Sequence, residues 1–120
     1  AGLGDAQLVL LPVNNNEDAE RAEGGSHWTL LSYDKSRGFC HWDSMRGSGN
    51  AAVARAMARR LGPLVGAGGA ARVQQPGCEQ QPNGCDCGVF ALCFAEALLR
   101  EVKAKGWARE KEVGKLEAGA

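Results

Sequence analysis

The fold is decided by residues 80–93, which read Gln-Gln-Pro-Asn-Gly-Cys-Asp-Cys-Gly-Val-Phe-Ala-Leu-Cys. Residues 82–84 mark a turn, and apolar residues recur at helical spacing between positions 89 and 99. This pattern predicts a polar loop that leads into a buried helix from Asp86 to about Lys103. A thiol, that of Cys87, stands at the junction of loop and helix.

The position of Cys87 suits a catalytic nucleophile. At a helix start, the unpaired backbone N–H groups and the positive end of the helix dipole favour a thiolate over a thiol. Asp86 is a good N-cap residue, and Gly88 lets a substrate backbone come close. The Cys87 N–H and the side-chain amide of Gln81 are candidate oxyanion donors. A single cysteine at a helix start is more often a small buried residue, so the catalytic interpretation depends on partner groups.

Composition disfavours several classes of function. The chain has 120 residues, enough for one domain, and its 14 basic residues balance 14 acidic ones. This balance gives no reason to expect nucleic acid or an anionic membrane as a partner, and no apolar run approaches a bilayer span. Five cysteines, at positions 40, 78, 85, 87 and 93, lack the even spacing of a disulfide scaffold. We expect a monomer in a reducing compartment, the cytosol or the nucleus.

Two aromatic and aliphatic runs, residues 27–33 and 38–43, predict a β-hairpin. If Tyr33 pairs with Arg37, His27 lies directly opposite Asp43, with Cβ atoms roughly 4.5 to 5.5 Å apart. A slip of one residue would place the two side chains on opposite faces, and a slip of two would make them diagonal neighbours. Turn geometry decides between these registers, so the sequence leaves the pairing open.

The rest of the chain predicts short elements joined by Gly-rich connectors. Pro12 restricts the first strand to a strand end or a sheet edge, and Asn50 is a plausible N-cap for the first helix. In chain order we expect a strand (residues 7–13), an exposed loop (17–26), a helix (51–61), a short strand (70–73) and, after the long helix, a charged Ala-rich tail (106–120) to which no function is assigned.

A base and an orienting acid for Cys87 are available upstream, in the hairpin. A cysteine nucleophile needs a base to take its proton and a third group to hold that base in the right tautomer. The chain has two histidines. His27 stands at a strand start beside a loop, which suits a solvent-reachable base, whereas His41 lies mid-strand, where a structural role is expected. The candidate triad is therefore His27, Asp43 and Cys87.

The order His, Asp, Cys, with a Gln six residues before the Cys, resembles the ubiquitin-like-protein-specific proteases of the sentrin-protease family. The matching residues are His27-Trp28, His41-Trp42-Asp43-Ser44 and Gln81-Pro82-Asn83-Gly84-Cys85-Asp86-Cys87-Gly88. The resemblance implies an α+β, papain-like cysteine-protease fold, in which a mixed sheet carries His27 and Asp43 and faces the N-terminus of the Cys87 helix. Residues 1–105 would be the C-terminal portion of the catalytic domain, so that the chain begins inside that domain.

The resemblance also implies roles for residues and a substrate. Gln81 would hold the oxyanion, no metal or cofactor would be needed, and Gly88 would line the substrate's path. Trp28 would lie as a flat wall over the peptide, which leaves width only for a Gly-Gly end. Ubiquitin, SUMO and the Nedd-type modifier all end in this way. The sequences Leu11-Pro12-Val13-Asn14 and His41-Trp42-Asp43-Ser44 resemble the deneddylase branch, so the Nedd-type modifier is the expected substrate and SUMO the alternative.

Two interpretations from other classes stay open. A metal module could use Cys78, Cys85 and Cys87 with His41 or Cys40, although the Cys85–Cys87 spacing is one residue short of a zinc knuckle. A non-catalytic domain that binds a ubiquitin-like protein would carry the same motifs without turnover. Metal analysis tests the first interpretation, and reaction with a ubiquitin-like electrophile tests the second.

Overall fold

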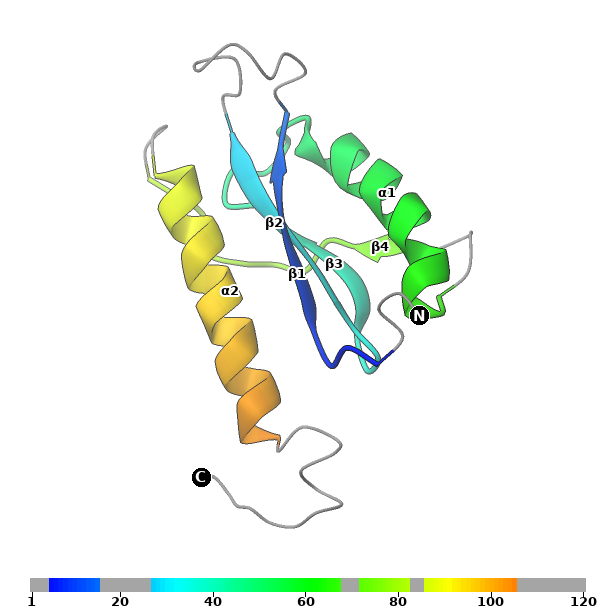
Figure 1. The fold of residues 1–120 in the computed structure, drawn as a ribbon. Coiled ribbons are helices and arrows are strands. Elements are labelled where there is room, and N and C mark those ends of the chain that lie inside the picture. Colours follow the sequence, from blue (N-terminus) through cyan, green and yellow to red (C-terminus); the bar gives the residue numbers. More distant parts are fainter. Residues whose placement is uncertain (1–4, 16–26, 68–71, 83–85, 106–120) are drawn as a thin grey trace.

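The chain folds as a mixed four-stranded sheet between two helices, seen in a computed structural model that describes residues 5–15, 27–67, 72–82 and 86–105 (Figure 1). The α+β class is confirmed. The predicted loop at 17–26, Cys85 and the predicted tail at 106–120 lie outside the described residues. The strands stand in the order β1-β2-β3-β4, with antiparallel pairing except between β3 and β4; their bounds are Val9–Asn14, Trp28–Asp34, Gly38–Trp42 and Val73–Gln74.

One helix covers each face of the sheet (Figure 1). Helix α1 (Asn50–Leu61) packs on the face that carries Leu31, and helix α2 (Cys87–Ala104) packs on the face that carries Leu30. Successive residues of a strand point to opposite faces, so Leu30 and Leu31 belong to two different hydrophobic cores, one on each face of the sheet. This explains why the strand reads as a nearly continuous apolar run and not as an alternation.

The first strand lies at the edge of the sheet. β1 pairs with β2 alone, and Pro12 stands exposed in its middle. Proline has no N–H to donate, so an edge, where one side of the strand needs no partner, accommodates it. The prediction that Pro12 limits the strand to an edge is confirmed.

The register of the hairpin differs from direct opposition of His27 and Asp43. β2 pairs Tyr33 with Phe39, so of the registers that the sequence leaves open the structure has the one shifted by two residues from the pairing of Tyr33 with Arg37. The shift preserves the face of every side chain, because the period of a strand is two. His27 and Asp43 therefore become diagonal neighbours on one face of the sheet.

The turn accounts for this register. Asp34 pairs with Gly38 across a three-residue loop, and Gly38 has a φ of 81°, in the left-handed region that favours glycine. The Asp34 carboxylate accepts hydrogen bonds from the backbone N–H groups of Ser36 (3.0 Å) and Arg37 (2.8 Å). Both features fix a compact turn and, with it, the pairing of every residue that follows.

Helix α1 begins at Asn50, one residue earlier than expected, and Asn50 is not its cap. The N-cap position belongs to Gly49, and no side chain caps the helix. The fully buried Asn50 amide instead donates to the carbonyl oxygens of His27 (3.1 Å) and Val13 (3.3 Å) and to the hydroxyl of Thr29 (3.2 Å). The N-cap prediction is wrong because the Asn50 amide donates to buried oxygen atoms in and beside β1 and β2. If Asn50 capped the helix instead, these buried acceptors would lose their donor.

The Gly62-Pro63 pair ends α1, as the sequence predicts. The chain continues as a short 3₁₀ helix, η1 (Gly62–Val65), which closes on Gly66 with a φ of 80°. β4 (Val73–Gln74) then overlaps the strand expected at 70–73 at Val73 and extends one residue beyond it; residues 70 and 71 lie outside the described residues. Its parallel pairing with β3 brings the following loop back toward the end of β3.

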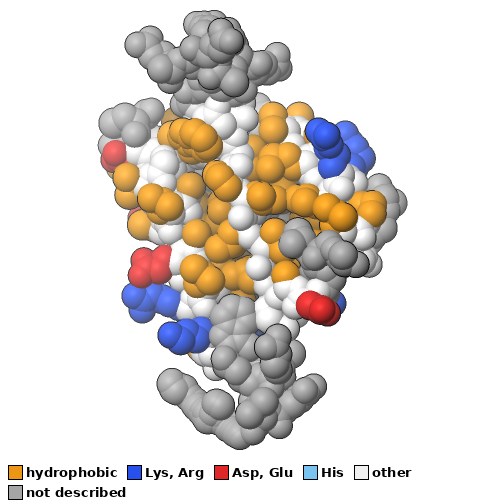
Figure 2. Space-filling view, viewed as in Figure 1, with side chains coloured by type: hydrophobic (Ala, Val, Ile, Leu, Met, Phe, Trp, Pro, Cys, Tyr) orange, Lys and Arg blue, Asp and Glu red, His pale blue; other side chains and the backbone are white. Residues whose placement is uncertain are grey.

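Helix α2 turns part of its apolar surface outward. Its exposed apolar side chains are Val89 (59% exposed), Leu92 (74%) and Leu99 (45%). Figure 2 shows hydrophobic side chains spread across one face of the molecule, with charged groups toward its rim. Within the described ranges, no helix combines the length and the apolarity needed to cross a membrane.

Candidate active site

A buried hydrogen bond joins the predicted base to the predicted acid. His27 directly precedes β2, and Asp43 directly follows β3, so the ends of two adjacent strands carry them. The His27 Nε2 atom lies 2.7 Å from Asp43 Oδ1, and the two residues are 4% and 7% exposed. Because Asp43 occupies Nε2, the ring nitrogen that remains to accept a proton is Nδ1.

The Asp43 carboxylate is held in its charged form. Oδ1 also accepts from the Met45 backbone N–H (2.8 Å), and Oδ2 accepts from the Ser48 hydroxyl (2.6 Å). Burial alone would raise the pKa of Asp43, but the hydrogen bonds from Ser48, His27 and Met45 together bring that pKa below its ordinary value. An anionic Asp43 fixes the His27 ring with its Nε2 proton toward the carboxylate.

Ser48 is a functional residue that sequence reasoning missed. It lies in the turn-rich connector between β3 and α1, where small polar residues are ordinary and no spacing rule points to one of them. Its contact with Asp43 joins residues that are five positions apart in the chain. The sequence offered one signal for Ser48, namely that its hydroxyl stands only five positions after the candidate catalytic carboxylate of Asp43.

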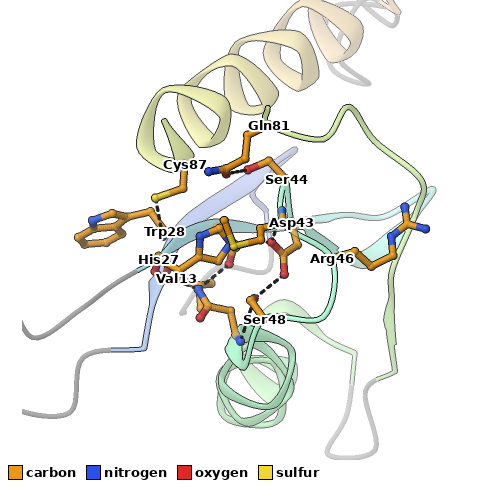
Figure 3. A network of polar contacts seen from close by, with 12 residues as sticks. Val13, His27, Trp28, Asp43, Ser44, Arg46, Ser48, Gln81 and Cys87 are labelled. Carbon is orange, nitrogen blue, oxygen red and sulfur yellow. Dashed lines mark hydrogen bonds and ion pairs between the residues drawn. The ribbon is translucent and has the colours of Figure 1, made fainter. Parts of the chain in front are cut away.

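The nucleophile candidate lies beside the base. Cys87 is the first residue of α2 and is 7% exposed. Its Sγ accepts a hydrogen bond of 3.3 Å from the Trp28 backbone N–H, and Trp28 follows His27 directly in the chain. The first residue of α2 thus contacts the first residue of β2. The Cys87 thiol and the His27 imidazole therefore lie at the same end of β2 (Figure 3).

The neighbours of Cys87 follow the sequence prediction only in part. Asp86 occupies the N-cap position, but no side-chain capping bond is made to the helix. A Cβ built at Gly88 would meet nothing within 4 Å, so packing inside the described chain does not require a glycine there. The Trp28 side chain is 44% exposed, which leaves its indole accessible to a second molecule.

The predicted oxyanion residue reaches the site through Ser44. The Gln81 backbone N–H donates to the Ser44 carbonyl oxygen (2.8 Å), and the Ser44 hydroxyl donates to Gln81 Oε1 (2.5 Å). Gln80 adds a second connection, because its Nε2 donates to the Asp43 carbonyl oxygen (2.9 Å). The loop before α2 is therefore fastened to the chain that follows β3, and all four predicted catalytic residues converge (Figure 3).

The second histidine is part of the core. His41 is 1% exposed; its Nε2 lies 2.7 Å from the Thr29 hydroxyl, and its Nδ1 contacts the Gln75 side-chain oxygen. Burial lowers the pKa of His41, which keeps the ring neutral at physiological pH. Both of its nitrogens are occupied, in agreement with the structural role expected from its position in the strand.

The other described cysteines are less suited to nucleophilic attack. Cys40, Cys78, Cys87 and Cys93 are all free thiols. Burial raises the pKa of Cys40 and of Cys78, so both are protonated at neutral pH, and the Cys78 thiol donates to the Asp43 carbonyl oxygen. In the part of the chain that the structure describes, which omits Cys85, no group of three or more His, Cys, Asp or Glu side chains is placed to hold a metal ion.

The fold is similar to that of solved proteases. Structures of the SUMO protease Ulp1, with the catalytic cysteine oxidized to a sulfonic or a sulfinic acid, superpose with a TM-score of 0.57 in both cases. The identities are 22% and 23%, over 76% of this chain and 41% of those chains. At this level of identity, the likeness concerns the fold.

Sequence relatives are more similar. NEDD8-specific protease 1 of Arabidopsis thaliana is 38% identical over 112 residues, which are 92% of this chain and 49% of that protein. Sentrin-specific protease 8 of Homo sapiens is 37% identical over 102 residues, 82% of this chain and 46% of that protein. The chain thus spans about half the length of the curated relatives it matches. Residues 2–118 match the Ulp1 protease family, C-terminal catalytic domain, and the chain belongs to that family.

Proposed function

We propose that this chain carries the catalytic centre of a cysteine protease that removes or matures a ubiquitin-like modifier, with NEDD8 as the favoured modifier. One observation carries the proposal. The Cys87 sulfur accepts a hydrogen bond from the residue next to His27, while His27 itself is bonded to Asp43. Nucleophile, base and orienting acid are thereby assembled from three separate parts of the chain, as thiol catalysis requires.

The reaction would proceed in two steps. In the first, His27 takes the Cys87 proton at Nδ1, and the sulfur attacks the carbonyl carbon of the modifier's terminal glycine. The Gln81 amide and the Cys87 backbone N–H hold the resulting oxyanion. The C–N bond then breaks, the imidazolium gives its proton to the leaving amine, and a thioester remains. Asp43 keeps the imidazole in the tautomer that this sequence needs.

In the second step, His27 takes a proton from water, and the resulting hydroxide attacks the thioester carbonyl. The carbon–sulfur bond breaks, the modifier leaves with a free C-terminal carboxylate, and the proton returns to the sulfur. Trp28, exposed beside the nucleophile, would cover the Gly-Gly end of the modifier, and the absent side chain of Gly88 would leave room for its backbone. No metal or cofactor takes part in this scheme.

The choice of NEDD8 rests on the sequence relatives. The relatives with 37% and 38% identity include one named for NEDD8, whereas the Ulp1 structures named for SUMO are 22% and 23% identical. SUMO is the alternative substrate. The four cysteines that the structure describes are free thiols, which supports a reducing compartment, the cytoplasm or the nucleus. We further propose that the protein acts as a monomer, without nucleic-acid or membrane partners.

The test compares the release of a fluorophore from the C-termini of NEDD8, SUMO and ubiquitin. We expect fastest release from NEDD8, loss of release in Cys87→Ala, and full activity in the control Cys93→Ala, whose thiol is exposed on the same helix. Faster release from SUMO would reject the NEDD8 assignment and keep the protease assignment. Activity that survives Cys87→Ala but not Cys85→Ala would place the nucleophile at Cys85.

A binding measurement separates catalysis from recognition. If the chain binds a modifier without releasing the fluorophore, and if Cys87 does not react with a modifier that carries a C-terminal vinyl sulfone, the chain is a non-catalytic binding domain. We expect the vinyl sulfone to attach to Cys87 and to leave Cys93 unmodified, because Cys87 contacts the residue next to His27, whereas Cys93 is exposed on α2.

A further inference from the structure

Residue Ser44 holds Gln81 at two points. Its backbone carbonyl oxygen accepts the Gln81 backbone N–H at 2.8 Å, and its hydroxyl donates to Gln81 Oε1 at 2.5 Å. Ser44 is 2% exposed, so water does not compete for these bonds. A glutamine side chain that is otherwise rich in rotamers is therefore fixed both at its root and at its tip.

The orientation of the Gln81 amide decides whether it can stabilise an oxyanion. A side-chain amide carries an acceptor and a donor at opposite edges of one plane. With Oε1 held by the Ser44 hydroxyl, the Nε2 group is turned to the other edge, and Figure 3 shows this nitrogen end on the side of Cys87. Rotation of the amide by half a turn would aim lone pairs of Oε1 at the oxyanion, which would repel it.

We propose that Ser44 is a positioning residue that holds the Gln81 amide in its donating orientation, with Oε1 toward the Ser44 hydroxyl and Nε2 on the side of Cys87. The proposal rests on the proposed function, because it assigns Gln81 to the oxyanion. Ser44 follows Asp43 directly in the chain, so two consecutive residues orient the two halves of the catalytic apparatus. Asp43 orients the base, and Ser44 orients the oxyanion donor.

A second connection keeps the two segments together when the Ser44 hydroxyl is removed. Gln80 donates to the Asp43 carbonyl oxygen at 2.9 Å, and its side-chain oxygen accepts the Arg46 backbone N–H at 2.9 Å. The backbone bond between Gln81 and Ser44 also survives in Ser44→Ala. The variant therefore removes the Ser44 contact at the tip of the Gln81 side chain, while the remaining bonds hold its backbone in place.

The kinetic test is a double-mutant cycle with Ser44→Ala and Gln81→Ala, measured on hydrolysis of the NEDD8 fluorophore conjugate. We expect kcat to fall about tenfold in Ser44→Ala, the scale of one ordinary hydrogen bond, and roughly a hundred- to a thousandfold in Gln81→Ala, with KM little changed in both. Ser44→Ala should have no further effect in the Gln81→Ala background. An equal loss in both backgrounds would overturn the proposal.

The rate at which the vinyl sulfone labels Cys87 distinguishes two kinds of defect. A general structural defect would lower this rate, whereas the loss of an oxyanion donor would not. Addition of a thiolate to a vinyl sulfone creates no carbonyl oxyanion, so Ser44→Ala should label at nearly the native rate. Ser44→Thr, which keeps the hydroxyl, should restore hydrolysis. The control Ser36→Ala removes a hydroxyl in the exposed hairpin turn and should leave both reactions at the native rate. A native chain that neither hydrolyses nor labels would instead refute the proposed function.

A measurement on the resting protein tests the same point without turnover. The Gln81 side-chain amide should give one sharp pair of ¹⁵N-resolved proton signals in the native chain, and these should shift or broaden in Ser44→Ala while signals of the hairpin stay in place. Unchanged Gln81 signals would overturn the proposal even if the variant lost activity.

Discussion

Removal of the Ser48 hydroxyl should destabilise the fold in a pH-dependent manner. The hydroxyl donates to Asp43 Oδ2 at 2.6 Å, and this carboxylate is 7% exposed. A hydrogen bond to a charged group contributes about 1.5–3 kcal/mol. Ser48 itself is half-buried, so water can replace part of the bond in Ser48→Ala. We therefore expect a loss near the lower end, about 1.5 kcal/mol in the free energy of unfolding at about pH 7.

The pH dependence follows from the direction of the Asp43 shift. The pKa of Asp43 is lowered in the folded chain, so its contribution to stability is complete above the unfolded pKa of about 3.9 and is lost as the pH falls through the folded pKa. Without Ser48, burial is opposed by fewer hydrogen bonds, and the folded pKa rises. The difference between native chain and variant should therefore shrink as the pH falls from about 7 to about 3. Protonation of His41 affects both proteins and cancels in the difference.

The assay is urea unfolding of the native chain and of Ser48→Ala at several pH values, with thermal unfolding as a second measurement. A loss of about 1.5 kcal/mol corresponds to a fall of roughly 6–12 °C in the unfolding temperature. The matched control is Ser36→Ala, which removes a hydroxyl 2.8 Å from Asp34 Oδ1 in an exposed turn and should cost less. A loss that is the same at every pH, or that grows on acidification, would refute the assignment of Ser48 to the charged form of Asp43.

Three further variants test other parts of the site. Asp43→Asn keeps the shape of the side chain but favours the wrong His27 tautomer, so kcat should fall about 10⁴-fold, and a small fall would remove Asp43 from the mechanism. Asn50→Ala leaves buried acceptors on His27 and Val13 without their donor and should cost about 2–3 kcal/mol in urea unfolding, whereas a neutral effect would mean that the amide contributes nothing. Gly38→Ala should cost about 1 kcal/mol from its φ of 81° alone, since a Cβ there meets nothing within 4 Å, and a much larger cost would indicate a clash.

Local sequence patterns were sufficient to predict the main helices and strands. Helical spacing and a turn signal predicted α2 to within one residue at each end, with Cys87 at its start. Aromatic and aliphatic runs predicted β2 and β3, and Pro12 predicted the edge position of β1. These features depend on residues that are near one another in the chain, so short windows of sequence contain the information.

The register of the hairpin was only partly predictable from local sequence patterns. Asp34 and Gly38 carry the turn signal, yet the competing alignment differs by two residues and buries the same face, so hydrophobic patterning does not separate them. The left-handed conformation of Gly38 makes the choice. The structure therefore has the register in which His27 and Asp43 are diagonal neighbours, one of those that the sequence left open.

The contacts that complete the site depend on tertiary structure alone. Trp28 and Cys87 are 59 positions apart, Ser44 and Gln81 are 37 apart, and Asn50 gathers acceptors from two strands. Serine and asparagine are common in connectors, and any of them could have met solvent instead. The sequence by itself determined which residues have the chemistry for thiol catalysis. Only the packing of α1 and α2 against opposite faces of the sheet decided which small polar groups hold those residues, because a hydrogen bond between distant segments exists only once both segments are in place.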